Sequence, residues 1–211
     1  MTLDSQPKST IGITQMDALE LPNNNFWTRA AEAGAISIGK AISTKVGGLF
    51  TASACTGGKA VLSSATKKNV AKLGAAVAGR TADYVLLLNS TNYYDLLGEL
   101  DSAVYGNADP IQKGYIERLF GFKAVVEATD LPVGVTGALV PANGLAIAVR
   151  PVAIPDMGAY PEAGVVTDEN GFSITAMRHT AFATGKAFMN VTCLVGATLT
   201  QPELTKYIAA S

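Results

Sequence analysis

Apolar residues recur along this chain with two different periods, and each period predicts a type of element. Between residues 26 and 50 they recur every three or four positions without a proline, which predicts one long amphipathic helix. Asn24 or Asn25 is the expected N-cap. Glycines inside a helix each cost up to about 1 kcal/mol, so we expect this helix to pack closely along its length. Its predicted apolar face comprises Trp27, Ala31, Ala35, Ile38, Ile42, Val46 and Leu49, and its glycines are Gly34, Gly39, Gly47 and Gly48.

The residues around this helix predict strands and a small α/β unit. Ile11 and Ile13 alternate with polar residues as in a strand, and Pro22 with three asparagines ends that stretch. A second helix is expected over residues 64–78, with Val70, Leu73 and Val77 on one face and Gly79 as its stop. A buried strand over 82–90 and a short helix over 91–100 follow.

The second half of the chain reads mainly as strands. Residues 115–128 predict two short strands around a Gly121–Phe122 corner, and residues 144–154 predict another strand, in which Pro151 requires an edge or a bulge. The stretch "PDMGAYPEAG" is interpreted as irregular. Phe172, Ile174 and Ala176 alternate in one strand and residues 187–195 in the next, joined as a hairpin through "TAFATGK".

The composition is apolar for a chain of 211 residues, with 48% hydrophobic and only 16% charged residues. Either a Gly- and Ala-rich core or burial against other subunits accounts for it. The apolar runs are far shorter than the roughly 20 residues that span a membrane, so no membrane partner is expected. The net charge of −1 gives no sign of a nucleic-acid surface, and Lys67, Lys68 and Lys72 are expected on the solvated face of a helix.

Candidate chemistry is sparse, and no catalytic, cofactor-binding or metal site is expected. The stretch "TGGKA" departs from a phosphate-binding loop, because that motif needs glycine at position 53 and Ser or Thr at position 60. The lone His179 has no Cys or His at metal-ligand spacing and no GxSxG serine beside it, so a structural or surface role is expected. Cys55 and Cys193 lack CxxC spacing, which implies neither a disulfide framework nor zinc.

Two carboxylate pairs and one tyrosine pair complete the candidates. General acid–base catalysis would need both carboxylates of a pair in one pocket. The spacing of Asp95 and Glu99 is instead typical of a solvated helix face, and the adjacent Asp168 and Glu169 are typical of a hairpin turn. Tyr93 and Tyr94 would offer a stacking platform for bases only with basic residues nearby, and none are nearby in sequence. Packing and interfaces remain as the expected roles.

Five segments in order carry a resemblance to a known family. They are "NNNFWTRAAEAGAISIGKAISTKVGGLFTA", "RTADYVLLLNSTNYYDLLGEL", "GYIERLFGFKAVVEATDLP", "GLAIAVRPVAI" and "GFSITAMRHTAFATGKAFMNVTCLVGATLTQPE". Together they resemble the major capsid proteins of tailed bacteriophages, which have the Hong Kong 97-like fold. The resemblance implies an α+β fold in which a long spine helix packs on a β-hairpin in a peripheral domain, beside an α/β axial domain.

The resemblance also implies boundaries and partners. Residues 26–52 and 156–195 would form the peripheral domain, 53–155 and 196–211 the axial domain, and 1–25 a remnant of an extended-loop strand. The chain would assemble with itself into pentamers and hexamers of an icosahedral shell enclosing double-stranded DNA, which it contacts non-specifically. Scaffolding, portal and decoration proteins are further expected partners. The expected location is the virion capsid, assembled in the cytoplasm of the bacterial host.

The chain departs from the family at its N-terminus. Only about 25 residues precede the spine helix. From the resemblance we therefore expect a chain without the N-terminal arm and most of the extended loop, and we hypothesise a truncated or incomplete gene product. The lysine of the Lys–Asn cross-link of some family members would lie in that loop, so no such cross-link is expected here. The spine helix is expected to bend near Gly34 and Gly39 when a shell matures.

Three other classes of protein remain alternatives. An encapsulin-type nanocompartment shell protein shares the fold and encloses enzymes instead of a genome. A small α/β enzyme would need a cluster of polar residues in one cleft. A phage decoration or tail protein is usually β-rich, and the long helical pattern argues against it.

Overall fold

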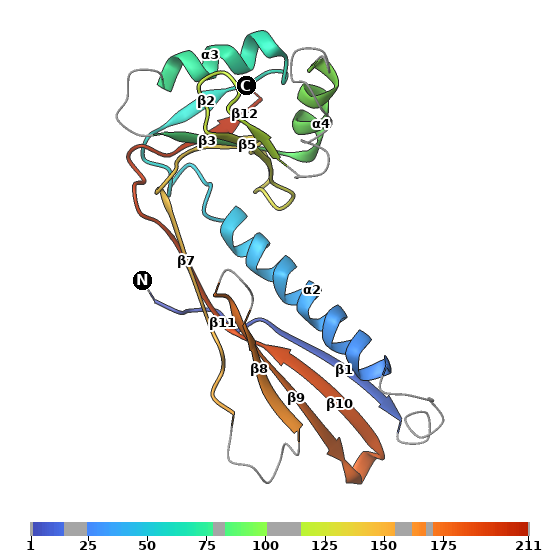
Figure 1. The fold of residues 1–211 in the computed structure, drawn as a ribbon. Coiled ribbons are helices and arrows are strands. Elements are labelled where there is room, and N and C mark those ends of the chain that lie inside the picture. Colours follow the sequence, from blue (N-terminus) through green and yellow to red (C-terminus); the bar gives the residue numbers. More distant parts are fainter. Residues whose placement is uncertain are drawn as a thin grey trace. The chain divides into compact units, whose positions relative to one another are not determined.

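The computed structural model describes residues 2–14, 25–77, 83–100, 115–154, 162–167 and 171–210 of the chain. The chain forms two compact units. Unit 1 comprises Met1–Ile42 and Ile147–Ala197, and unit 2 comprises Ser43–Ala146 and Thr198–Ser211. Figure 1 gives the elements of both units, which are described separately below.

Unit 1 is built on a four-stranded antiparallel sheet with strand order β1-β10-β9-β8. Helix α2 (Asn25–Gly47) lies along this sheet (Figure 1). A separate two-stranded sheet pairs β7 (Leu145–Arg150) with β11 (Leu194–Leu199). The strands of the larger sheet are β1 (Lys8–Thr14), β8 (Glu162–Thr167), β9 (Ser173–Ala181) and β10 (Lys186–Thr192), and the 3-10 turn η1 (Phe182–Thr184) joins the last two.

Helix α2 approaches the sheet through small residues. Ala30, Gly34 and Ile38, spaced four apart, are the buried residues of its unit 1 portion. Ile38 packs with Val191 of β10 and with Cys193 and Val195, which together form the core of unit 1. The predicted long helix is therefore confirmed, and Gly34 lies close to Val191 of β10.

The two central glycines of α2 have opposite surroundings, which leads to a prediction. A methyl group at Gly34 would lie 2.5 Å from Cγ2 of Val191, whereas one at Gly39 would meet nothing within 4 Å. We expect Gly34→Ala to lower the free energy of unfolding by about 1 kcal/mol, because the valine must give way. Gly39→Ala should raise it by about 0.5–1 kcal/mol. Guanidinium unfolding followed by the fluorescence of Trp27, the single tryptophan, measures both changes.

The same pair of variants also tests the predicted bending of the helix. Gly34 is explained by its contact with Val191, so Gly39 is the glycine at which bending remains a prediction. The family resemblance implies a shell that matures, and in such a shell Gly39→Ala should impede maturation if the helix bends at this residue. Unchanged maturation of the variant would contradict this expectation.

Unit 2 contains a six-stranded mixed sheet with strand order β2-β12-β6-β3-β5-β4. The pairs β3–β5 and β2–β12 are parallel, and the remaining pairs are antiparallel. The strands are β2 (Lys59–Val61), β3 (Tyr84–Leu88), β4 (Tyr115–Glu117), β5 (Ala124–Glu127), β6 (Gly137–Pro141) and β12 (Lys206–Ala209). The helices are α3 (Lys67–Val77) and α4 (Ser90–Glu99).

Both faces of this sheet are covered. On one face Leu86 and Leu88 of β3 pack with residues of α3 and α4 in the largest core cluster. On the other face Leu87 and Val140 pack with Phe50 and Cys55, which follow α2 in the chain. Because side chains alternate along a strand, neighbouring residues of β3 belong to different clusters.

The predicted strand pair around the Gly121–Phe122 corner is confirmed, since β4 and β5 pair antiparallel. Arg118, Phe120 and Gly121 have φ of 50°, 48° and 84°, which places all three in the left-handed region. This tight reversal turns Phe122 into the core, where it is 1% exposed. The corner therefore serves packing.

Several predicted boundaries need correction. The second helix begins at Lys67 instead of residue 64, because Thr66 accepts from the Asn69 amide (3.4 Å) as a cap. Strand β7 ends at Arg150, so Pro151 lies just beyond the strand and not within it; β7 is itself an edge strand, because its sheet has only two strands. The expected strand over 187–195 is two strands divided at Cys193. Residues 162–164, interpreted as irregular, belong to β8.

Three residues predicted to bound helices are not among those that the structure describes. Asn24, Ala78 and Gly79 lie outside the described residues, as does Pro22. Asn25 is the first residue of α2. The short helix α4 begins at Ser90, and Oδ1 of Asn89 caps it by accepting from the Asn92 amide at 3.0 Å.

Candidate functional site

The Gly-rich turn before β2 is explained by backbone packing. The amide of Gly57 donates to the carbonyl oxygen of Pro202 at 2.8 Å. A methyl group at Gly57 would lie 2.5 Å from the carbonyl oxygen of Thr205 and 2.7 Å from that of Glu203. Glycine is therefore required because a second backbone segment passes close to it, and this accounts for "TGGKA" without a phosphate.

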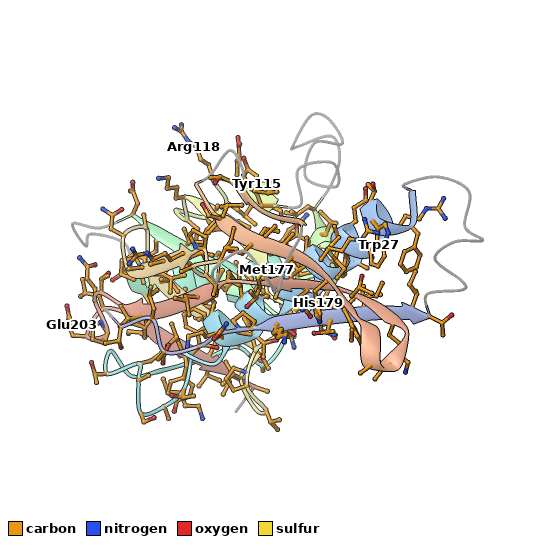
Figure 2. The ribbon with its side chains drawn as sticks, turned by 90° about the horizontal axis from the view of Figure 1, so that it is seen from below. Trp27, Tyr115, Arg118, Met177, His179 and Glu203 are labelled. Atoms are coloured by element: carbon orange, nitrogen blue, oxygen red, sulfur yellow. The ribbon has the colours of Figure 1, made fainter. Side chains whose placement is uncertain are left out.

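His179 belongs to a hydrogen-bonded row across three strands of unit 1. Its Nδ1 lies 3.2 Å from the side-chain amide nitrogen of Asn190, which is 3% exposed. Oδ1 of Asn190 accepts from the Thr10 hydroxyl at 2.8 Å. The imidazole also stacks on Phe188 at 5.1 Å between ring centroids. These contacts connect β1, β10 and β9 and support the structural role expected for His179, which Figure 2 labels among the side chains of unit 1.

The described carboxylate pair does not line a common site. Oε2 of Glu99 accepts from the Lys67 amide at 2.7 Å, at the N-terminus of α3, where a negative charge is favourable. Asp95 is exposed on α4. Glu99 thus caps a neighbouring helix. The second pair, Asp168 and Glu169, lies outside the described residues.

The two tyrosines of α4 are arranged edge to face. Their ring centroids are 5.5 Å apart with planes at 85°. Tyr93 is 3% exposed, and burial raises the pKa of its phenol, with smaller contributions from Glu127 and Tyr94. Only Tyr94 faces solvent, so the pair does not form a parallel platform for bases.

The other candidate groups are dispersed. Cys55 and Cys193 are buried free thiols, one in each unit, and burial raises the pKa of both. Lys68 and Lys72 are exposed on α3, as predicted. Among the described residues no three His, Cys, Asp or Glu side chains gather as a metal site. No described helix has the length and apolar character needed to cross a membrane.

Two of the hollows in the described surface differ in character. A cavity of about 640 Å³ beside the corner of unit 2 is lined by charges of both signs, including Asp83, Glu117, Arg118 and Lys123. Figure 2 shows Tyr115 and Arg118 projecting together from this corner. In unit 1 an apolar groove of about 350 Å³ is lined by Ala35, Ile38, Gly39, Ile42, Val166, Phe172 and Ile174.

Sequence reasoning did not find the apolar groove. Its lining comes from α2, β8 and the start of β9, which are far apart along the chain. The available signal was the uncharged run of residues 163–167, directly before the predicted hairpin, but residues 163 and 164 were interpreted as irregular.

Comparisons with known proteins identify the family of this chain. A model of the family described as phage capsid protein matches residues 9–196. A search of curated proteins found no match. Among solved structures, the capsid of a native GTA particle is 15% identical with a TM-score of 0.57, covering 97% of this chain and 71% of that chain.

Two further structures extend the comparison. The capsid structure of the cyanophage P-SCSP1u is 11% identical with a TM-score of 0.54, covering 98% of this chain and 72% of that chain. A virus-like particle from Pyrococcus furiosus is 12% identical with a TM-score of 0.54, covering 97% of this chain and 76% of that chain. At such identities these likenesses show the fold alone.

Proposed function

Because this chain belongs to the phage capsid protein family, we propose that its copies assemble into pentamers and hexamers of an icosahedral shell around phage double-stranded DNA. The observation that carries the proposal is the family match over residues 9–196. The resemblance drawn from the sequence is confirmed by this match, and the α+β Hong Kong 97-like fold by the likeness to capsid structures. The chain is a structural capsid subunit.

We assign unit 1 to the peripheral domain and unit 2 to the axial domain. This assignment is supported by the composition of each unit: α2 packs on the long hairpin of β9 and β10 in unit 1, and α3 and α4 pack on the mixed sheet of unit 2. The boundaries of the compact units differ from those expected from the sequence, since residues 43–52 belong to unit 2.

Assembly in this proposal results from many modest contacts. Each subunit contact is weak alone, and closure of the shell stabilises all of them together through multivalency. Contacts that join different patches of two copies form rings when the rotation closes. This function is structural and requires no active site, which agrees with the expectation that the chain is not an enzyme.

The proposed partners beyond the chain itself follow from the same role. Packaged DNA would be enclosed by the shell and contacted without sequence specificity, and the net charge of −1 indicates that this contact is not driven by a general attraction for phosphates. Scaffolding, portal and decoration proteins would act during assembly in the bacterial cytoplasm, and the mature subunit would be located in the virion capsid.

A nanocompartment shell is the second candidate function. The likeness to the virus-like particle from Pyrococcus furiosus is the observation that favours it. The family match favours the phage capsid. Nuclease-protected DNA inside particles isolated from the native host would support the capsid, and an enclosed enzyme without DNA would support the nanocompartment.

Light scattering of the purified chain over a range of concentrations tests assembly. We expect the mass to rise from the 21.8 kDa of one subunit to that of rings or shells as concentration increases. A mass that stays at one subunit at every concentration would contradict the proposal that this chain assembles by itself.

A further inference from the structure

The apolar groove of unit 1 lies between one side of α2 and the β8–β9 side of the sheet. Ala35, Ile38 and Ile42 form its helical wall, and Val166 and Ile174, which are paired across β8 and β9, form its sheet wall. Its volume of about 350 Å³ continues over Gly39, where a methyl group would meet nothing within 4 Å. The helix therefore leaves part of the apolar sheet face uncovered at β8.

Large apolar side chains are exposed around the groove. Val166 is 60% exposed and Phe172 is 36% exposed. Ile36 is 75% exposed and lies three residues before Gly39, so it borders the groove on the helix surface. We call Ile36, Gly39, Val166 and Phe172, together with the groove, the groove patch. Soluble monomers rarely expose a contiguous apolar surface of this kind without using it.

The surroundings of the groove patch have the anatomy of a protein interface. The exposed residues Glu32 and Lys40 border it along α2, so charges lie at its rim and not in its centre. In the described sheet β8 is an edge strand, and its residues 163–167 are exposed and carry no charge. Edge strands that avoid other chains usually carry charges, proline or a bulge. Residues 163–167 of β8 present an uncharged surface instead.

We propose that the groove patch is a subunit contact and that its occupant is a second copy of this chain. This inference rests on the proposed function, because in a shell of one protein the neighbours of each subunit are copies of itself. Such a subunit must bury apolar surface against those copies, and in unit 1 the large exposed apolar side chains of the described residues gather at β8 and this groove.

Two substitutions on the same strand test the contact. Val166 faces the groove, whereas Val165 faces the opposite side of the sheet and is 48% exposed. We expect V166K to raise the concentration needed for assembly at least about tenfold, because a lysine ammonium would be buried in an apolar contact. V165K should leave the concentration needed for assembly within about twofold of the native value. Light scattering measures assembly, and Trp27 fluorescence checks the fold of unit 1 in both variants.

The outcomes separate this inference from the proposed function. Normal assembly of V166K would overturn the groove contact while leaving self-assembly standing. Equal loss of assembly in V166K and V165K would also overturn it, because the effect would not depend on the groove face. A native chain that never assembles would overturn the proposed self-assembly and this contact with it.

Thiol labelling of assembled particles gives a second, independent measurement. The native cysteines are at most 1% exposed, so a maleimide reports only on an introduced thiol. We expect the V166C thiol to react at least about tenfold more slowly in particles than in dissociated subunits, and the V165C thiol to change less. Because the sample contains only this chain, protection identifies a second copy as the cover. If the V166C thiol reacts as fast in particles as in dissociated subunits, no second copy occupies the groove.

Discussion

Phe122→Ala is expected to lower the free energy of unfolding of unit 2 by about 3–5 kcal/mol. The ring is 1% exposed and belongs to the core cluster shared by α3, α4 and the sheet. Its removal leaves a cavity that the surrounding strands cannot fill, because the corner at Arg118–Gly121 fixes the position of the backbone. Hydrogen exchange of amides in β3, followed by mass spectrometry, reports this loss within unit 2.

The matched control for this prediction is Phe172→Ala. Phe172 is 36% exposed at the groove of unit 1, so its truncation removes a similar ring with much less buried contact. We expect Phe172→Ala to lower the free energy of unfolding by about 1 kcal/mol or less, and only in unit 1. Equal losses for the two phenylalanines would contradict the placement of the corner in the core.

Gly74→Ala is the second substitution with a large expected effect. We expect it to lower the free energy of unfolding of unit 2 by about 3 kcal/mol. Gly74 is buried in the middle of α3, and a methyl group there would overlap the carbonyl oxygen of Phe120 at the corner. A backbone atom cannot rotate away as a side chain does, so α3 would have to move off the corner. Guanidinium unfolding followed by helical circular dichroism measures the change.

Gly98→Ala provides the control within the same unit. Gly98 lies in α4, and a methyl group there would meet nothing within 4 Å. Alanine should therefore stabilise this helix by about 0.5–1 kcal/mol. If Gly74→Ala is as stable as Gly98→Ala, the close packing of α3 on the corner is wrong.

Elements with a clear local period could be predicted from the sequence. The three- and four-residue spacing from Trp27 to Val46 identified α2, and the alternation in residues 172–176 and 187–192 identified the hairpin of β9 and β10. The corner at Gly121 was found because short apolar runs flank a Gly-Phe pair. In each case the signal lies within one segment.

Elements that depend on distant partners could not be predicted. Strand β6 is buried on both faces and shows no alternation, and the short strand β12 forms only by pairing between β2 and β6. The break at Cys193 interrupts an apolar alternation that continues through it in sequence. Such features are determined by long-range pairing, which a single-sequence pattern does not contain.

The same distinction holds for the candidate site. A structural or surface role was expected for His179, and a place on a solvated helix face for Glu99. Their actual contacts, with Asn190 and with the Lys67 amide, required the structure. The groove is lined by residues of α2, of β8 and of the segment that leads into and starts β9, which are far apart along the chain. No local motif encodes it.

Negative-stain electron microscopy of the purified chain, at the highest concentration at which it is soluble, shows whether its copies assemble. We expect rings with five or six subunits, or closed shells. A field of single 21.8 kDa subunits, without rings or shells at any concentration, would contradict the claim that this capsid-family chain assembles by itself.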